Sequence, residues 1–577
     1  MKKIFTTCMM ALSGIMMMSA FTPQPEIYEN YDIAAISNNG KWIAAKYADG
    51  YSVLIKNLES GEEWFYEAEL IGNPTVGYEP LSSYGLGRER CISDDGIVVG
   101  TIDDVAAYWE NGEWHELPSG SRHGVSYASA ITPDGKRIVG FGGTPVVWDR
   151  KNDGTYGQAV SLPTPSRDVT GRRPQYTSGI SISNDGKTVG AFMRDFLGLL
   201  QQPVVIKCDD KGNWTQTLLG TDLLNPNHVE FPPYPGDFNE MMPNYEDYMS
   251  VDQRIAWETA HDYWMNNGEI GPEPMAADFM DEDMREAWNK VYIPWYEKYI
   301  VWAEKYSKFE QALDDCYSNG VDFLQNNVCI SPDGRYLAAT RIKEDIVMGM
   351  WEPEITVKYA PTLFDTETGD WTLYDYGLNL VVSYLGDNNN LLANVLDPDG
   401  IQQRNAYIYP AGKFEPMLIQ DFIYETSPTT WAWMEDNMMQ TVITGVDDFG
   451  LVWEDMICTG IPKATSDLSV IVTAIGTDMW DYAEAAMYSY VFPTGLKSSG
   501  VEKVQNAEEY GLTVGDNGTL NLTGEFSNIE IFNIAGMKVW GKANAGGTQA
   551  TGLSKGIYII KGVTASGDEI LKKVILP

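Results

Sequence analysis

Few residues in this 577-residue chain have the types and spacing that catalysis requires. The histidines number four, His115, His123, His228 and His261, which restricts any histidine-based acid–base chemistry. The chain has no Gly-x-Ser-x-Gly nucleophile motif, no His-Glu-x-x-His zinc motif and no glycine-rich phosphate loop. The sequence therefore predicts no catalytic residue, no metal site and no cofactor, and it leans away from an enzyme.

Carboxylates are the one abundant chemical group, with 81 Asp and Glu against 40 Lys and Arg, a formal net charge of -41. A pair of carboxylates can cleave a glycosidic bond, but this abundance singles out no pair. Asp278, Asp281 and Asp283 lack the glycine of a calcium loop and suit the first turn of a helix. The charge also predicts that nucleic acid and anionic membranes are not partners, because both are polyanions.

One four-residue turn recurs between short apolar runs. An Asp-Gly or Asn-Gly pair there favours a hairpin, because glycine adopts positive φ without a steric cost. The recurrence indicates a repeat architecture in which each copy pairs two strands. The copies are Ser37–Gly40, Ser93–Gly96, Thr132–Gly135, Ser183–Gly186 and Ser331–Gly334.

A second hairpin follows in most copies, as in Ala106–Leu117 with its Asn111-Gly112 turn. Units of four strands are typical of propeller blades. The predicted fold class is mainly β: a propeller of about seven blades over residues 21–495, with six or eight as alternatives. Blades are expected near 31–75, 88–120, 127–165, 177–220, 326–376 and 380–420, with a degenerate seventh at 464–492.

These repeats resemble known families. Ile92–Gly100 followed by Ala107–Trp109 and Trp114–Leu117 resembles the extracellular HAF repeats, and Ile330–Ala338 resembles the TolB and WD40 propeller repeats. Both resemblances imply a propeller, and neither implies an activity. The turn differs from the sialidase Asp box, Ser-x-Asp-x-Gly, because here glycine directly follows the aspartate.

The first 20 residues read as a secretory signal peptide. Met1–Lys3 is basic, Ile4–Met18 is largely apolar, and Ala20 offers a small residue for cleavage. The apolar stretch is too short for a membrane anchor, and no later stretch is long enough to span a bilayer. The mature chain is expected to be exported and to lack a transmembrane span.

The C-terminal region has another character. A polar linker is predicted at 496–510, and short alternating strands then predict a β-sandwich at 511–577. This segment resembles the C-terminal sorting domain of the type IX secretion system of Bacteroidetes, on motifs that include Gly536, Gly556, Tyr558, Lys572 and Lys573. The resemblance implies the secretion machinery as a partner and a secreted, cell-surface or periplasmic location. An accessory sandwich is the alternative.

A helical insertion is predicted at 224–320, inside the propeller. Ser250–Gln253 forms a capping box for a helix that runs to Met265. A second helix is expected from Asp278 to Tyr292, ending before Pro294, and a third carries an aromatic stripe from Trp295 to Phe309. From Asp237 to Asp315 the insertion has 19 acidic and 6 basic residues.

Two interpretations of the aromatic stripe remain open. In a helical cap over the propeller face it could stack on sugars or peptide, or it could hold the helices to the blades beneath them, which its periodicity favours. Phe231 and Tyr234, in a Pro-rich stretch that cannot be helical, are the better candidates for ligand contact. No disulfide framework is expected, and Cys316 with Cys329 is the one pairing to examine.

Taken together, these features favour an exported or cell-surface propeller that binds a glycan or a protein. A carbohydrate-active enzyme with carboxylates on the propeller face and a structural assembly subunit are the alternatives. Clustered carboxylates in a pocket would favour the enzyme. A large exposed apolar patch would favour the assembly subunit.

Overall fold

A computed structural model describes most of the chain, which divides into two compact units, Met1–Thr494 and Gly495–Pro577. In the first unit the described residues are 21–47, 52–66, 75–76, 90–102, 105–118, 126–268, 270–348, 353–396, 403–437, 445–446, 452–453, 459–475 and 488–494. In the second they are 495–496, 512–514, 520–522, 526–533, 538–543, 548–550, 556–564 and 569–576. The predicted cleavage residue Ala20, the linker from 497 to 510 and the motif residue Gly536 lie outside these ranges.

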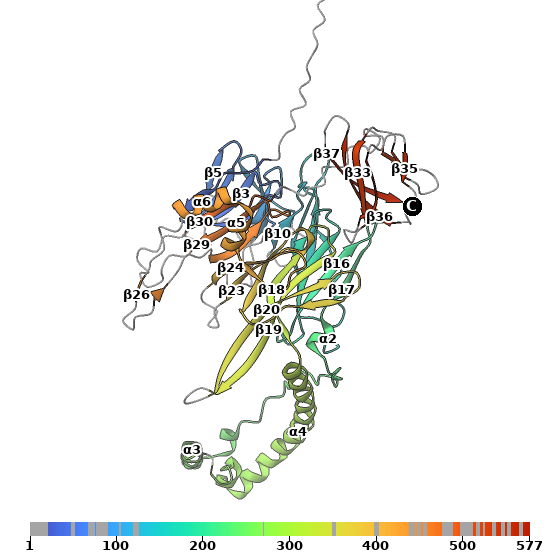
Figure 1. Ribbon diagram of the computed structural model, residues 1–577. Coiled ribbons are helices and arrows are strands. Elements are labelled where there is room, and N and C mark those ends of the chain that lie inside the picture. Colours follow the sequence, from blue (N-terminus) through green and yellow to red (C-terminus); the bar gives the residue numbers. More distant parts are fainter. Residues whose placement is uncertain are drawn as a thin grey trace, which may run out of the picture. The chain divides into compact units, whose positions relative to one another are not determined.

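Four-stranded antiparallel sheets, formed by strands in chain order, build the first unit (Figure 1). The first is β2 (Tyr31–Ile36), β3 (Trp42–Tyr47), β4 (Val53–Asn57) and β5 (Glu63–Tyr66), and the second is β6 (Thr75–Val76), β7 (Val98–Ile102), β8 (Val105–Glu110) and β9 (Glu113–Glu116). The third is β10 (Tyr127–Ile131), β11 (Arg137–Phe141), β12 (Pro145–Asp149) and β13 (Val160–Ser161). The fourth is β14 (Tyr176–Ile182), β15 (Thr188–Arg194), β16 (Gln201–Cys208) and β17 (Trp214–Leu218).

The later sheets follow the same plan. The fifth is β18 (Asp322–Ile330), β19 (Tyr336–Met348), β20 (Pro353–Asp365) and β21 (Trp371–Leu373), and the sixth is β22 (Leu380–Leu385), β23 (Leu391–Leu396), β24 (Gln403–Tyr409) and β25 (Met417–Leu418). The last is β28 (Thr459–Ala464), β29 (Val470–Ile475), β30 (Tyr488–Pro493) and, at its edge, β1 (Glu26–Glu29). The prediction of a mainly β chain of repeated four-stranded units is confirmed.

Between the sixth and last sheets lie α5 (Ile419–Thr426), α6 (Pro428–Asn437) and the short pair β26 (Gly445–Val446) and β27 (Val452–Trp453). A short helix, α2 (Thr221–Leu224), follows the fourth sheet. Among the described residues no helix has both the length and the apolar character needed to cross a membrane.

Neighbouring sheets contact one another in chain order, and the last returns to the first. Strand β10 contacts β7 and β14, β18 contacts β14 and β22, and β28 contacts β22 and β2. Strand β1 pairs with β30, with Glu26 opposite Val491 and Glu29 opposite Tyr488. The N-terminal strand thus completes a sheet whose other three strands come from the end of the unit, which leaves β30 without a free edge.

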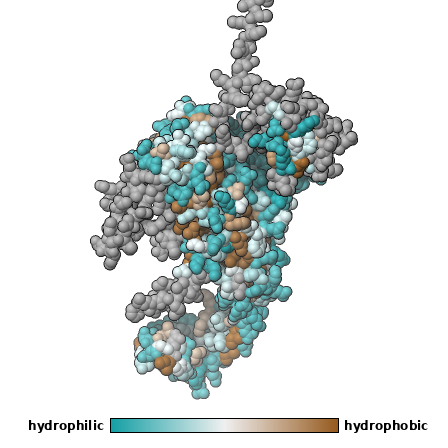
Figure 2. Space-filling view, in the orientation of Figure 1, coloured by the Kyte–Doolittle hydropathy of each residue, from teal (hydrophilic) through white to brown (hydrophobic). Residues whose placement is uncertain are grey.

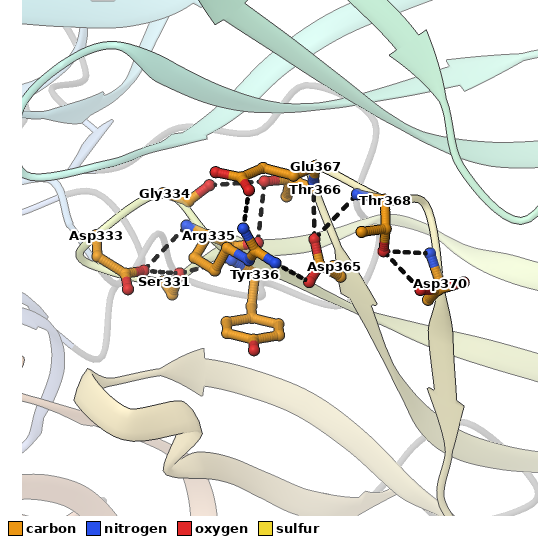
Figure 3. A network of polar contacts seen from close by, with 10 residues as sticks. All are labelled: Ser331, Asp333, Gly334, Arg335, Tyr336, Asp365, Thr366, Glu367, Thr368 and Asp370. Atoms are coloured by element: carbon orange, nitrogen blue, oxygen red, sulfur yellow. Dashed lines mark hydrogen bonds and ion pairs between the residues drawn. The ribbon is translucent and has the colours of Figure 1, made fainter. Parts of the chain in front are cut away.

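The recurring turn is held by its own side chains, as the fifth sheet shows (Figure 3). The Ser331 hydroxyl donates to Asp333 Oδ1 at 2.6 Å and accepts from the Tyr336 N–H at 2.9 Å. Gly334 has φ +73°, and a Cβ there would meet Thr188 of the fourth sheet. The Arg335 guanidinium bonds the carboxylates of Asp365 and Glu367. These contacts explain why a hydroxyl, an aspartate and a glycine recur at fixed positions.

Successive turns also bond one another. The Asp94 N–H donates to the Pro133 carbonyl at 2.8 Å, and Asp94 Oδ1 accepts from the Asn39 N–H at 2.7 Å. Across the closure, the Ser466 N–H donates to Asn38 Oδ1 at 3.0 Å. The second residue of each of these turns therefore contacts the next turn, so the sequence motif joins sheets as well as strands.

Asp94 gives this junction a pH dependence. Burial raises the pKa of its carboxyl to about 6, against an opposing effect of the bond from the Asn39 N–H. Because the folded state then binds more protons than the unfolded state between about pH 4 and about pH 6, stability falls as the pH rises through that window. Asp94→Asn removes the titration and keeps an acceptor oxygen, as Asn38 and Asn184 do in equivalent turns.

We expect Asp94→Asn to raise the free energy of unfolding by about 1 kcal/mol at pH 7 and to leave it unchanged near pH 4. Urea unfolding at both pH values measures the difference. Asp95→Asn, in the exposed neighbour, is the control. Equal effects of Asp94→Asn at both pH values would contradict the assignment of the titration to Asp94.

Arg90, which precedes β7 of the second sheet, forms hydrogen bonds with three further sheets. It is 8% exposed, and its guanidinium donates to the Ile182 carbonyl of the fourth sheet at 3.1 Å and to the Leu385 carbonyl of the sixth at 3.0 Å. Its own carbonyl accepts from the Ile131 N–H of the third sheet at 2.9 Å. One side chain thus spans sheets that are not neighbours in the chain.

The helical insertion contains η1 (Tyr245–Tyr248), α3 (Val251–Asn266), η2 (Ala276–Phe279) and α4 (Glu282–Asn319). The predicted capping box is confirmed: the Gln253 N–H donates to Ser250 Oγ at 3.3 Å, and Gln253 Oε1 accepts from the Ser250 N–H at 2.8 Å. The prediction of two helices separated at Pro294 is wrong, because α4 continues through this residue.

Packing across Pro294 explains this continuity. The segment 236–248, which ends in η1, contacts α4 on both sides of the proline: Tyr248 lies 5.5 Å from Trp288, and Phe238 lies 5.8 Å from Trp295, between ring centroids. The Trp295 indole N–H also donates to the Glu240 carbonyl at 2.9 Å. These contacts offset the backbone hydrogen bond that proline removes.

The second unit holds two antiparallel sheets. One contains β31 (Leu512–Val514), β32 (Leu520–Leu522) and β35 (Thr548–Ala550), and the other is ordered β34 (Lys538–Ala543), β33 (Phe526–Asn533), β36 (Gly556–Thr564) and β37 (Glu569–Leu576). Leu520 and Ala550 are buried in the first sheet, and Ile529, Ile531 and Ile560 in the second. Both sheets therefore carry residues that are covered in the folded unit.

Candidate functional site

An open groove of about 560 Å³ lies where strands β8 and β9 of the second sheet meet the turn that follows β12 of the third. This volume falls within the range of small-ligand sites. The lining residues are Tyr108, Trp114, His115, Glu116, Pro118, Lys151, Thr155 and Tyr156.

The floor of the groove is aromatic. Tyr108 stands opposite His115 in the β8–β9 pairing, and their ring centroids are 5.0 Å apart. Tyr156 of the third sheet packs edge-on against Tyr108, 4.8 Å between centroids. Because adjacent strands place opposed residues on one face of the sheet, the alternation of β8 and β9 brings Tyr108 and His115 together.

Tyr156 anchors the third sheet to this floor. Its hydroxyl donates to the Gly135 carbonyl at 2.6 Å, and burial raises the pKa of the phenol. Beside it, Arg150 forms an ion pair with Glu110 of β8 at 2.5 Å. The two sheets are therefore fixed to each other at the base of the groove, which makes the site rigid before any ligand arrives.

Polar groups stand at the rim. Glu116 is exposed, and Lys151 and Thr155 lie in the turn between β12 and β13. The Lys151 ammonium can donate hydrogen bonds, the Glu116 carboxylate can accept them, and the Thr155 hydroxyl can do both. Half-buried His115 and Pro118 add apolar surface between these groups.

A ring-shaped ligand that has an apolar face and several hydroxyl groups fits this arrangement best. The apolar face would pack against His115 and Pro118, and each hydroxyl can both donate and accept at the rim. Glu116 is the one carboxylate among the eight lining residues. The groove thus supplies binding groups but not the carboxylate pair that glycoside hydrolysis needs.

The sequence pointed instead to Phe231 and Tyr234, and the structure places these rings against other parts of the chain. Phe231 lies 5.8 Å from Phe309 of α4, and Tyr234 lies 5.1 Å from the same ring. The Arg172 guanidinium is 4.6 Å from the Tyr234 ring centroid. The contacts described for Phe231 and Tyr234 are therefore packing contacts, both within the insertion, with Phe309 of α4, and outside it, with Arg172.

The remaining predicted site residues belong to the second unit. Tyr558 is buried in β36, and Gly556 begins that strand. Lys572 and Lys573 lie in β37, opposite Ile560 and Ile559. The described cysteines Cys91, Cys208, Cys316 and Cys329 form no disulfide, so the pairing of Cys316 with Cys329 is not formed.

No protein-family model and no curated protein sequence matches this chain. Among solved structures it is similar to the β-propeller domain of the trilobed protease from Pyrococcus furiosus, at 8% identity over 82% of this chain and 98% of that one, TM-score 0.33. It is also similar to TolB from Acinetobacter baumannii, at 8% identity over 81% and 79%, TM-score 0.27. A third is the Cps50 (Swd1) β-propeller domain of Myceliophteria thermophila, at 9% identity over 63% and 79%, TM-score 0.29. These scores are too low to argue from, so the fold rests on the strand pairing described above.

Proposed function

We propose that this chain is an exported glycan-binding protein whose body is one closed, seven-bladed β-propeller. The support for the ring is the order of sheet contacts, which runs through seven four-stranded sheets in the described part of residues 26–493 and returns to the first. The support for binding is the groove between the second and third sheets, where an aromatic floor meets a rim of hydrogen-bonding groups.

One observation supports the glycan assignment. The His115 ring lines the same groove as rim groups that both donate and accept hydrogen bonds. A sugar residue presents hydroxyl groups around an apolar ring face, which matches this combination. A phosphate or carboxylate ligand would need a cluster of cations, and the lining has one lysine beside one glutamate.

His115→Ala should weaken glycan binding by about tenfold or more, because it removes the ring that packs against the apolar face of the sugar. Binding of the mature chain to a glycan array, followed by calorimetry with the best ligand, measures the loss. His261→Ala is the matched control, since His261 also packs against aromatic rings, those of Trp257 and Trp264, but outside the groove. Equal weakening of glycan binding by both variants, or glycan binding unaffected by His115→Ala, would exclude the groove as the glycan-binding site.

For delivery, we propose that residues 1–20 direct export and that the second unit, folded as a β-sandwich, is a sorting domain read by type IX secretion machinery. The sorting-domain motif residues Gly556, Tyr558, Lys572 and Lys573 support this proposal. Cells that express the full chain should carry it at the surface or in the medium, and a chain that ends at Thr494 should remain in the periplasm. Fractionation followed by immunoblotting distinguishes these locations; the same location for both chains would overturn the sorting role.

A further inference from the structure

The helical insertion has a second surface, beside the aromatic stripe that the chain itself covers. Segment 236–248 lies on that stripe, where Phe238 contacts Tyr299 at 5.5 Å and Trp302 at 5.6 Å between ring centroids. These contacts make the stripe part of the internal packing of the insertion, while Tyr299 remains 37% exposed.

Several apolar residues of α4 are exposed, and three of them lie along one side of the helix. Ile293, Tyr296 and Ile300 are 48%, 42% and 39% exposed, and they are spaced i, i+3 and i+7. Residues with this spacing form one continuous stripe along a helix. In Figure 2 hydrophobic residues alternate with hydrophilic ones over the insertion, at the bottom of the view. We call Ile293, Tyr296 and Ile300 the exposed stripe.

Carboxylates border the exposed stripe. Glu297 follows Ile293 by four residues and Glu304 follows Ile300 by four, so each lies beside the apolar residue on the helix surface. Both glutamates are exposed, and the insertion as a whole has 19 acidic and 6 basic residues from Asp237 to Asp315. The surface thus joins apolar anchor positions to two exposed carboxylates, with exposed Lys290 three residues before Ile293.

We propose that the exposed stripe docks a basic amphipathic helix of a partner protein. A helix with apolar residues at the same spacing can pack on Ile293, Tyr296 and Ile300, while its lysines or arginines face Glu297 and Glu304. A second copy of this chain is a poor occupant, because its net charge is -41 and the same acidic border would face itself. This site is separate from the groove and does not depend on glycan binding.

The test uses the mature chain and a synthetic Leu–Lys peptide with leucines at helical spacing, measured by fluorescence anisotropy. The double variant Ile293→Ser with Ile300→Ser should bind this peptide about tenfold more weakly or worse. Val301→Ser is the matched control, because Val301 lies on the same helix and is 53% exposed but sits outside the stripe. It should bind as the parent does.

A second peptide with the same composition but scrambled leucines separates docking from simple charge attraction. Weaker binding of the scrambled peptide, together with loss of affinity as salt rises from about 50 to about 500 mM, supports an apolar contact with a charged border.

Equal binding of both peptides, or equal loss in the stripe and Val301→Ser variants, overturns the proposal. Sedimentation that shows a dimer lost in the stripe variant would assign the surface to a second copy instead and would also overturn it. His115→Ala leaves peptide binding unchanged, so this result stands apart from the groove.

Discussion

Replacing Arg90 with methionine should lower the free energy of unfolding by about 2–4 kcal/mol, because the change leaves two buried carbonyls, those of Ile182 and Leu385, without their donor. Methionine keeps much of the volume of the arginine stem, so the loss reports the hydrogen bonds more than a cavity. The donated bonds reach two different sheets, and their removal should therefore lower the cooperativity of unfolding as well as the stability of the first unit.

Urea unfolding followed by tryptophan fluorescence measures this loss. Lys187→Met is the control, because Lys187 is half exposed and pairs with the nearly fully exposed Asp210, and such a solvent-exposed pair contributes little to stability. If Arg90→Met were no less stable than Lys187→Met, Arg90 would not be a structural link between sheets.

The second large effect is expected at the closing strand β1. Tyr28 is 6% exposed and packs with Ile33, Val472 and Val491, which come from both the first and the last sheet. Tyr28→Ala should cost about 3 kcal/mol, since it removes a buried aromatic ring at the point where the two sheets meet. Ile27→Ala, at an adjacent position that is 37% exposed, should cost less than about 1 kcal/mol.

Two hydrogen bonds to Glu26 and a cation–π contact of Lys56 with the Tyr28 ring strengthen this expectation. Glu26 accepts from the Tyr28 hydroxyl at 2.7 Å and from Lys56 Nζ of β4 at 2.6 Å, while the Lys56 ammonium lies 4.9 Å from the Tyr28 ring centroid. Thermal unfolding of both alanine variants provides the measurement. Similar losses for Tyr28→Ala and Ile27→Ala would show that β1 contributes little to closure.

The hairpins of the sheets could be predicted from local chemistry, but β1 could not. Turn residues such as Asp333 and Gly334 act on neighbours within a few positions, and the structure shows those contacts. Strand β1 has four residues, two of them glutamates, and no turn connects it to β30. Its partner lies at the other end of the unit, and no local pattern records such a pairing.

The groove between the second and third sheets could not be predicted from the sequence, for a related reason. Tyr108 and His115 were predicted to lie in paired strands, but the turn that carries Lys151 and Tyr156 comes from the next sheet. Phe231 and Tyr234 drew attention because a Pro-rich aromatic segment has no helical role, and the structure gives them packing partners instead. At Pro294 a local rule predicted a helix end, and the contacts of segment 236–248 overrode it.

The direction of β1 relative to β30 has a mechanical consequence. Glu26 is opposite Val491, so the end of β1 nearer the N-terminus and the end of β30 that leads to the second unit lie at the same end of the pair. Tension applied through both would peel the two strands apart one hydrogen bond at a time, whereas strands pulled from opposite ends share the load. A chain anchored at its C-terminal side and pulled at its N-terminal side would therefore open first at this seam, before any other sheet is strained.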